Sequence, residues 1–372
     1  MQRELLGLLL CAWPAMAGWA KIYSVEIDRT QCGASSQSYF PVLFHASDPS
    51  LRDTAHGGSV TSSNGYDIVV ATDTSIRTYQ PWEIEAWDNV NGVVWGWTQV
   101  AVLNGRAAGS NTTFAVAWGN SSIAAQQNTG GNAPWNVWSN HFSGVWHLGN
   151  GMTLGLSDAT SNLLALANTG GVGAAAGEIG GGANFSGTDY LSHADAAALH
   201  LASFTISAWV QPADFGDYRV IVNKGTNTVR NYNLYLNKDT GQVTVAFTQG
   251  AGAFKYVVSS GAVPVGSWSH IAGTYDGATL SVYINGAPDS SAAFSGSPDT
   301  STDALYIGQV GNGANYFSGN ADEPHISDVA RNGDWITAEY NNQNAPGDVG
   351  APGFLIWTAA AARTAGMPVV FD

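Results

Sequence analysis

Two glutamates in one short segment have the spacing that hydrolytic chemistry could use. Glu83 and Glu85 alternate with apolar residues in the segment 82–87 (WEIEAW), and Asp88 follows as a third acid. In a strand, both glutamates would point to one face with their carboxylates roughly 7 Å apart, between the separations of retaining and inverting glycosidases. The same alternation is typical of a solvent-facing strand face. We therefore interpret the pair as surface residues and predict that the protein is not an enzyme.

Other catalytic motifs are missing from the sequence. It contains no H-E-x-x-H, C-x-x-C or G-x-S-x-G pattern, which excludes the common zinc-hydrolase and serine-hydrolase signatures. His147 and His270 lie inside apolar runs, so we interpret them as packed or hydrogen-bonded core histidines. Gly180-Gly181-Gly182 is interpreted as a turn because no helix follows it to bind a phosphate.

The composition limits the possible partners. The chain has 372 residues and a net charge of −15, from 13 Lys and Arg against 28 Asp and Glu. This balance excludes a basic surface for nucleic acid and disfavours anionic membranes. With 45% hydrophobic residues, only 11% charged residues and 45 glycines, the chain has the character of a folded extracellular β protein.

The N-terminus has the pattern of a secretory signal peptide at residues 1–17. Arg3 precedes the apolar run Leu5–Trp13, and Ala15-Met16-Ala17 is an A-x-A cleavage site. Cleavage there would leave Cys32 as the sole cysteine, so we expect no intramolecular disulfide. We also expect no membrane insertion, because later apolar runs are too short to span a bilayer.

Short alternating runs separated by turns predict an all-β protein of two sandwich domains. The first is a small β-sandwich at residues 18–123, with six strands separated by Gly- and Asn-rich turns. A Gly- and Asn-rich linker at 124–143 follows, with little apolar material to pack.

The second predicted domain spans residues 144–344. Ten or more strands predict two stacked sheets, and Asp276-Gly277 and Asn285-Gly286 are strong hairpin turns. One helix is expected over Asp334–Gln343, with Asp334 as its N-cap. The C-terminal tail, 345–372, is loop-rich, with a possible edge strand at Val369–Phe371.

Several segments of the second domain resemble the laminin-G-like, concanavalin A-like jelly-roll family. They appear in the family's order: GVWHL at 144–148, ANFSGTDYL at 183–191, FTISAWV at 204–210, WSHIAGTYDG at 268–277 and GNADEPHISDVAR at 319–331. The last departs from the pattern at Pro324, which removes a ladder donor and suits an edge strand. The first domain resembles a bacterial domain family of unknown function that precedes such jelly rolls in secreted or virion-associated proteins.

The resemblance implies a calcium site. Asp189 in the F-x-G-x-D turn and Asp322 in the closing strand match positions at which this family often holds calcium, and Asp158 is a third candidate ligand. Calcium requires six to eight oxygen ligands, so such a site would be assembled from distant loops.

Three functions fit these features. The first is a secreted, non-enzymatic binding module that recognises glycans or surface polymers through jelly-roll loops. The second is a structural subunit of an extracellular surface layer, fibre or virion, in contact with copies of itself or other subunits. The third is a glycan-active hydrolase. Trp135 and Trp138, in the polar link, are candidate exposed aromatics for stacking on sugars.

Overall fold

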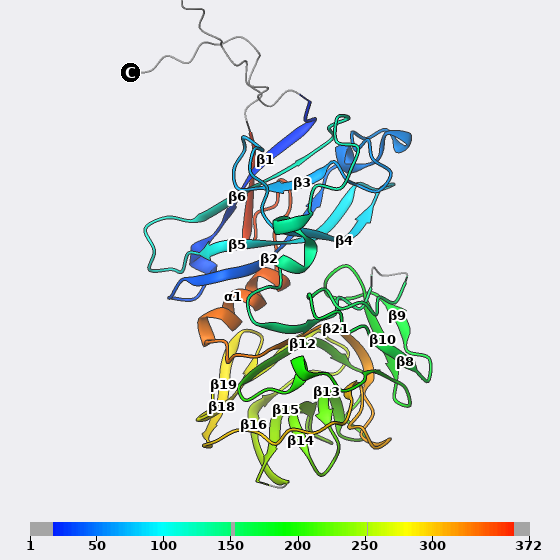
Figure 1. The fold of residues 1–372 in the computed structure, drawn as a ribbon, viewed down its shortest axis with the longest axis vertical. Coiled ribbons are helices and arrows are strands. Elements are labelled where there is room, and N and C mark those ends of the chain that lie inside the picture. Colours follow the sequence, from blue (N-terminus) through cyan, green and yellow to red (C-terminus); the bar gives the residue numbers. More distant parts are fainter. Residues whose placement is uncertain (1–17, 150–152, 251, 361–372) are drawn as a thin grey trace, which may run out of the picture.

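The computed structural model describes residues 18–149, 153–250 and 252–360 of the chain. It shows two β lobes, one above the other in Figure 1, with helix α1 (Gly333–Asn344) between them. The signal peptide expected at 1–17 and the edge strand expected at Val369–Phe371 lie outside the described residues. Within these residues, no helix is both long enough and apolar enough to cross a membrane.

The N-terminal lobe contains two antiparallel sheets. One has four strands in the order β22-β1-β6-β3 and the other three in the order β2-β5-β4. Alternate residues of β1 are buried, as expected for a strand with one face on a core. The strands are β1 (Lys21–Ile27), β2 (Gln37–Ser47), β3 (Ile68–Ala71), β4 (Trp82–Asp88), β5 (Val93–Leu103), β6 (Thr112–Trp118) and β22 (Leu355–Ala359).

The C-terminal lobe is a sandwich of two larger antiparallel sheets. Eight strands form the sheet β19-β18-β17-β12-β21-β10-β9 with β7 paired to β21, and seven form the sheet β16-β15-β14-β13-β20-β11-β8. The strands are β7 (Phe142–Val145), β8 (Ala167–Thr169), β9 (Gly173–Ala175), β10 (Gly182–Ser186), β11 (Tyr190–His193), β12 (Phe204–Pro212), β13 (Arg219–Gly225), β14 (Arg230–Leu236), β15 (Gln242–Gln249), β16 (Ala253–Ala262), β17 (Ser269–Tyr275), β18 (Thr279–Ile284), β19 (Ala287–Ala293), β20 (Leu305–Ile307) and β21 (Ser318–Ser327).

Short one-turn helices and tight turns connect the strands. The predicted hairpin turn after β18 is present, with φ of 49° at Asn285 and 73° at Gly286, as a two-residue turn of this type requires. The described 3-10 helices are η1 (Arg29–Gln31), η2 (Pro49–Leu51), η3 (Thr54–His56), η4 (Gly130–Asn132), η5 (Pro134–Asn136) and η6 (Ala197–Leu199).

Each lobe has its own apolar core, and a third cluster joins them. The N-terminal core lies between its two sheets and also receives Trp335 and Ile336 of α1. The C-terminal core fills the space between the eight-stranded and seven-stranded sheets. A smaller cluster between the lobes contains Trp97 of β5, Trp138 and Ile179.

Helix α1 is hydrogen-bonded to both lobes. The Asn342 side chain pairs with both backbone groups of Leu43 in β2, at 2.7 and 2.9 Å. On its other side, Gln343 accepts a 2.7 Å bond from the Trp209 indole of β12. The N-cap is Asn332, whose side chain accepts from Trp335 N, and not Asp334 as we expected. Asp334 instead accepts bonds from the backbone of the N-terminal lobe.

Two sequence expectations about connecting segments are wrong. The tail after 345 includes β22, which pairs with β1 and completes the first sheet, because Leu355 and Trp357 supply apolar side chains to that core. The segment 124–143 is not a loose linker throughout, since Val137 and Trp138 are fully buried between the lobes.

Pro324 lies in a central strand, which corrects the expected edge position. In β21, Glu323 and Pro324 together oppose the single residue Ala208 of β12, so the strand bulges there. The φ of Glu323 is 48°, in the left-handed region. A bulge tolerates proline because the extra residue makes no ladder bond, and it also redirects side chains.

Candidate functional site

An open groove lies against the outer face of the seven-stranded sheet. It encloses about 210 Å³ between β13, β14, β16 and the loop after β20. Alternation along β14 buries Tyr232, Leu234 and Leu236 in the core, which leaves Asn233 and Tyr235 on the groove side. The remaining lining residues are Tyr218, Val220, Arg230, Phe254, Val310 and Asn315.

Aromatic rings form the rim of this groove. Tyr218 is 43% exposed and Phe254 41% exposed. The Tyr218 ring meets Tyr235 edge to face at 5.9 Å, and Phe254 stacks on Tyr256 at 5.3 Å. The Arg230 guanidinium lies over Phe254, 5.0 Å from the ring centre. The rim therefore offers partly exposed ring surfaces held in place by their neighbours.

The floor of the groove contains an unsatisfied acceptor. Asn233 is 1% exposed, and its amide group donates to Asn223 Oδ1 at 2.7 Å. Its own Oδ1 is buried without a hydrogen-bond partner. A buried polar atom left unpaired costs about 1–3 kcal/mol, so a ligand hydroxyl or amide that reached it would recover that energy.

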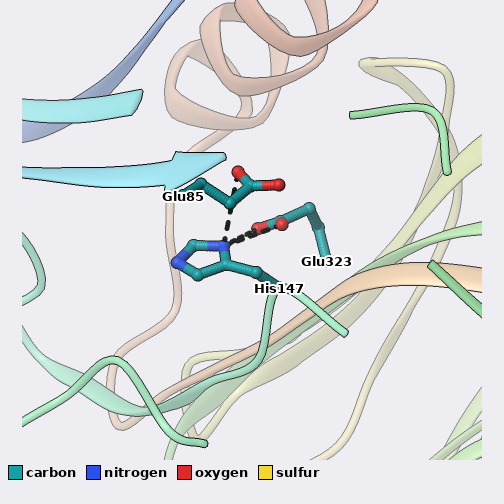
Figure 2. A group of neighbouring side chains, drawn as sticks. All are labelled: Glu85, His147 and Glu323. Atoms are coloured by element: carbon teal, nitrogen blue, oxygen red, sulfur yellow. Dashed lines mark hydrogen bonds and ion pairs between the residues drawn. The ribbon is translucent and has the colours of Figure 1, made fainter. Parts of the chain in front are cut away.

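A second feature, a charged cluster, lies where the lobes meet. Figure 2 shows His147, which follows β7, between Glu85 of β4 and Glu323 of β21. The His147 Nδ1 atom is 2.8 Å from Glu323 Oε1 and 3.8 Å from Glu85 Oε2. Its Nε2 atom is 3.1 Å from Glu83 Oε1. The imidazole therefore contacts carboxylates from both lobes.

Neighbouring donors fix these carboxylates in position. The indole of Trp97 donates to Glu85 Oε2 at 2.8 Å, and the indole of Trp138 donates to Glu83 Oε1 at 2.5 Å. His325 Nε2 lies 2.8 Å from Glu323 Oε2. The other oxygen of Glu85, Oε1, is buried without a hydrogen-bond partner.

Burial and crowding among like charges shift the pKa values in this cluster. Burial, reinforced by the nearby Glu323 charge, raises the pKa of Glu85 to about 8. Burial and the charges of Glu323 and Glu85 raise the pKa of Asp322 well above its usual value. Burial opposes ionisation of Glu323 too, but His147 and His325 outweigh it and lower the Glu323 pKa.

A related pair of histidines faces Glu339 on α1. His325 Nδ1 and His270 Nε2 are each 3.6 Å from Glu339 Oε1, and the Ser207 hydroxyl donates to the same oxygen at 2.8 Å. Burial would raise the pKa of Glu339, yet the two histidines lower it far below the usual range.

Comparison with known proteins identifies the fold of the C-terminal region. Residues 185–337 match the family model of the concanavalin A-like lectin/glucanases superfamily. They form a concanavalin A-like domain. The whole groove, from Tyr218 to Asn315, lies within this domain. No curated protein has a sequence significantly similar to this chain.

Several solved structures are similar to about half of this chain. Domain 4 of AbnA, a GH43 extracellular arabinanase from Geobacillus stearothermophilus solved with arabinotriose, is 22% identical, with a TM-score of 0.45 over 53% of this chain and 96% of that one. The binding domain of Paraclostridial Mosquitocidal Protein 1 is 17% identical, with a TM-score of 0.46 over 55% and 53% of the two chains. The botulinum neurotoxin serotype D binding domain is 12% identical, with a TM-score of 0.45 over 55% and 52%. The match spans about half of these toxin domains.

The three aspartates predicted to bind calcium lie apart in the concanavalin A-like domain and the segment before it. Asp189 and Asp322 flank opposite ends of β10, which are roughly 13 Å apart. Asp189 accepts from Ser186 N and Ser186 Oγ, both at 2.8 Å. Asp158 accepts from three backbone amides and one hydroxyl. Calcium binding by these residues stays a prediction.

The structure corrects the surface interpretation of Glu83 and Glu85. The Glu83 side chain is 12% exposed and that of Glu85 only 2%, because Trp97, Trp138 and His147 contact their carboxylates. Trp138, expected to be exposed, is 1% exposed and is hydrogen-bonded to Glu83, whereas Trp135 is 48% exposed as expected. The interpretation of His147 as a hydrogen-bonded histidine agrees with its contacts.

Sequence reasoning missed the groove and the convergence of the cluster. Glu85, His147 and Glu323 come from three segments of the chain, 62 and 176 residues apart, so no local motif could have united them. For the groove, the available signal was Tyr and Asn at alternate positions of β14, which places both on one face of that strand.

Proposed function

We propose that this protein is a secreted, non-enzymatic binding module that recognises glycans through the groove of its concanavalin A-like domain. The observation that carries the proposal is the combination of exposed Tyr218 and Phe254 rings with the unpaired Oδ1 of Asn233. Aromatic rings provide flat surfaces for the apolar faces of sugar rings, and a buried amide oxygen accepts from a sugar hydroxyl. The signal-peptide pattern at residues 1–17 supports export, which the intact mass of the exported protein tests.

The arrangement of Glu83 and Glu85 supports the non-enzymatic part of the proposal. Each carboxylate already accepts a hydrogen bond from a tryptophan indole, and Glu83 also contacts His147. A glycosidase pair needs both groups free to reach the scissile bond from opposite sides.

Glycan-array screening of the full-length chain, followed by calorimetry with the glycans that bind, tests the groove. We expect Tyr218→Ala and Phe254→Ala each to weaken binding by at least tenfold, because each removes a ring that a sugar would stack on. Asn233→Leu should also weaken glycan binding, because it removes the Oδ1 acceptor. Val265→Ala is the matched control, since Val265 is 51% exposed in the same lobe and does not line the groove.

Four outcomes would overturn the proposal. Retained affinity in both aromatic variants would remove the groove as the site, and loss in Trp135→Ala alone would place binding at the link. No binding to any glycan, together with regular polymers in size-exclusion chromatography and electron microscopy, would favour the structural-subunit alternative. Glycan hydrolysis that Glu83→Gln abolishes without unfolding the chain would favour the hydrolase alternative.

A further inference from the structure

We propose that Glu85, His147 and Glu323 form a binding site for a divalent transition-metal ion at the junction of the two lobes. Within residues 18–149, 153–250 and 252–360, these side chains are the group whose possible ligand atoms all lie within 4.8 Å of one another. Figure 2 shows the three groups converging from β4, from the segment after β7 and from β21. The site is independent of the glycan groove.

The spacing of the three groups fits a small cation. Tetrahedral ligands at about 2.0–2.1 Å from an ion stand about 3.3 Å from one another. The His147 Nδ1 atom is 2.8 Å from the nearer Glu323 oxygen and 3.8 Å from Glu85 Oε2. These two separations differ from the ideal value by about 0.5 Å each, so binding an ion would require a small adjustment of the side chains.

Two observations besides the clustering point to a ligand. The Glu85 side chain is 2% exposed, and its Oε1 atom has no hydrogen-bond partner. This oxygen lies against Gly180, where a Cβ atom would be 2.5 Å from it. Second, the carboxyl groups of Glu83, Glu85, Asp322 and Glu323 gather here, and the ionisable bases that contact this group are the imidazoles of His147 and His325. A divalent ion would balance this excess of acidic groups.

The surrounding residues have the arrangement of an outer shell. Metal-bound histidines usually bond their second ring nitrogen to a carboxylate, and here His147 Nε2 is 3.1 Å from Glu83 Oε1. Glu323 is held in turn by His325, and Glu85 by the Trp97 indole. All three ligand side chains are thus oriented without an ion.

A cleft gives the site an entry path. It encloses about 260 Å³ and is lined in part by Glu83, Glu85 and His147. Three protein ligands leave at least one coordination position for water. The imidazole nitrogen favours zinc or another transition metal over calcium, which prefers oxygen ligands throughout.

Zinc binding by the full-length chain tests the site. After dialysis against ZnCl₂ and then against metal-free buffer, elemental analysis should find one zinc per chain. Calorimetry should give the same stoichiometry, and Co²⁺ should give the visible absorption of a bound ion. Glu85→Gln should weaken zinc binding at least tenfold, while circular dichroism shows that it still folds. Glu178→Gln is the matched control, because Glu178 is a half-buried carboxylate outside the group.

A second readout separates this site from surface histidines. Zinc should raise the melting temperature of the wild type and of Glu178→Gln, because its ligands come from both lobes, and should leave that of Glu85→Gln unchanged. The absence of stoichiometric binding of Zn²⁺ and Co²⁺ to the wild type would overturn the proposal. Equal zinc affinity in wild type and Glu85→Gln would also overturn it, by placing the ion elsewhere.

Discussion

Glu339 illustrates how a single buried carboxylate can make stability depend on pH. His270 and His325 face it from β17 and β21, the Arg331 guanidinium lies nearby, and Ser207 donates to it from β12. Burial would raise the Glu339 pKa, but its interactions with His270 and His325 hold that pKa far below the ordinary value of 4.5. A depressed carboxylate pKa adds stability above pH 4.5, and that contribution is lost as the pH falls toward the folded-state pKa.

We therefore expect Glu339→Gln to lower the free energy of unfolding by about 3 kcal/mol at pH 7, because it leaves buried positive charge unpaired. Between pH 4.5 and pH 3 the difference should shrink by about 1.4 kcal/mol per pH unit, as the wild type loses its own contribution. Urea unfolding across this pH range measures both effects. Asp239→Asn is the control: it changes an exposed turn residue and should show neither the loss of stability nor its pH dependence. If the difference in unfolding free energy between wild type and Glu339→Gln stays constant with pH, the role assigned to the Glu339 pKa is wrong.

Asp158 provides a test of the calcium prediction at the same scale. Its carboxylate accepts from the amides of Val145, Thr160 and Leu164 and from the Thr160 hydroxyl. Removing it in Asp158→Ala leaves buried donors unpaired and should cost about 3 kcal/mol. Melting curves for wild type, Asp158→Ala and Asp189→Ala, with CaCl₂ and with EGTA, separate the two roles. If each variant lowers the melting temperature by the same amount in both buffers, the aspartates act through hydrogen bonds alone. If calcium raises the melting temperature of the wild type but not that of Asp189→Ala, the calcium prediction is supported.

At the scale of elements, the sequence predicted most of the strands because their signal is local. All six strands expected in the N-terminal lobe are present, and the turn at Asn285 and Gly286 has the backbone angles its sequence implies. Features that depend on distant partners were not predictable in this way. The sequence predicted Glu83 and Glu85 on an exposed polar surface, because alternation shows which residues share one face of a strand but not whether another segment covers that face. The bulge at Pro324 likewise depends on the register with β12.

Cleavage of the link between the lobes should not separate them. Ala124 and Ala125 are exposed, so a protease recognition sequence inserted between them is accessible. We expect the two fragments to co-elute in size-exclusion chromatography and to separate only in denaturant. The reason is that α1 is bonded to both lobes, and β22 pairs with β1 across the cut. Separation under native conditions would show that these contacts do not hold the lobes together.

At the scale of the whole molecule, the two lobes are interlocked in a way that domain boundaries along the chain do not describe. The N-terminal lobe takes its last strand, β22, from beyond the C-terminal lobe, and α1 contributes Trp335 and Ile336 to its core. The Glu and His cluster lies at this same junction. Composition and periodicity established two β-sandwich lobes, but they contain no information about which sheet a short apolar segment near residue 355 would join.

The pairing of β1 with β22 joins two segments that are synthesised far apart in time. Ile27 and Leu355 are register partners, yet about 330 residues separate them, which a ribosome adding 5–20 residues per second needs roughly 15–65 s to synthesise. During that interval one edge of β1 has no neighbour to pair with, and an unpaired edge is where newly made chains associate wrongly. The C-terminal lobe, whose strands are all complete before residue 330, can fold in the meantime. The first sheet of the N-terminal lobe can therefore be completed only after the strands of the C-terminal lobe have been synthesised.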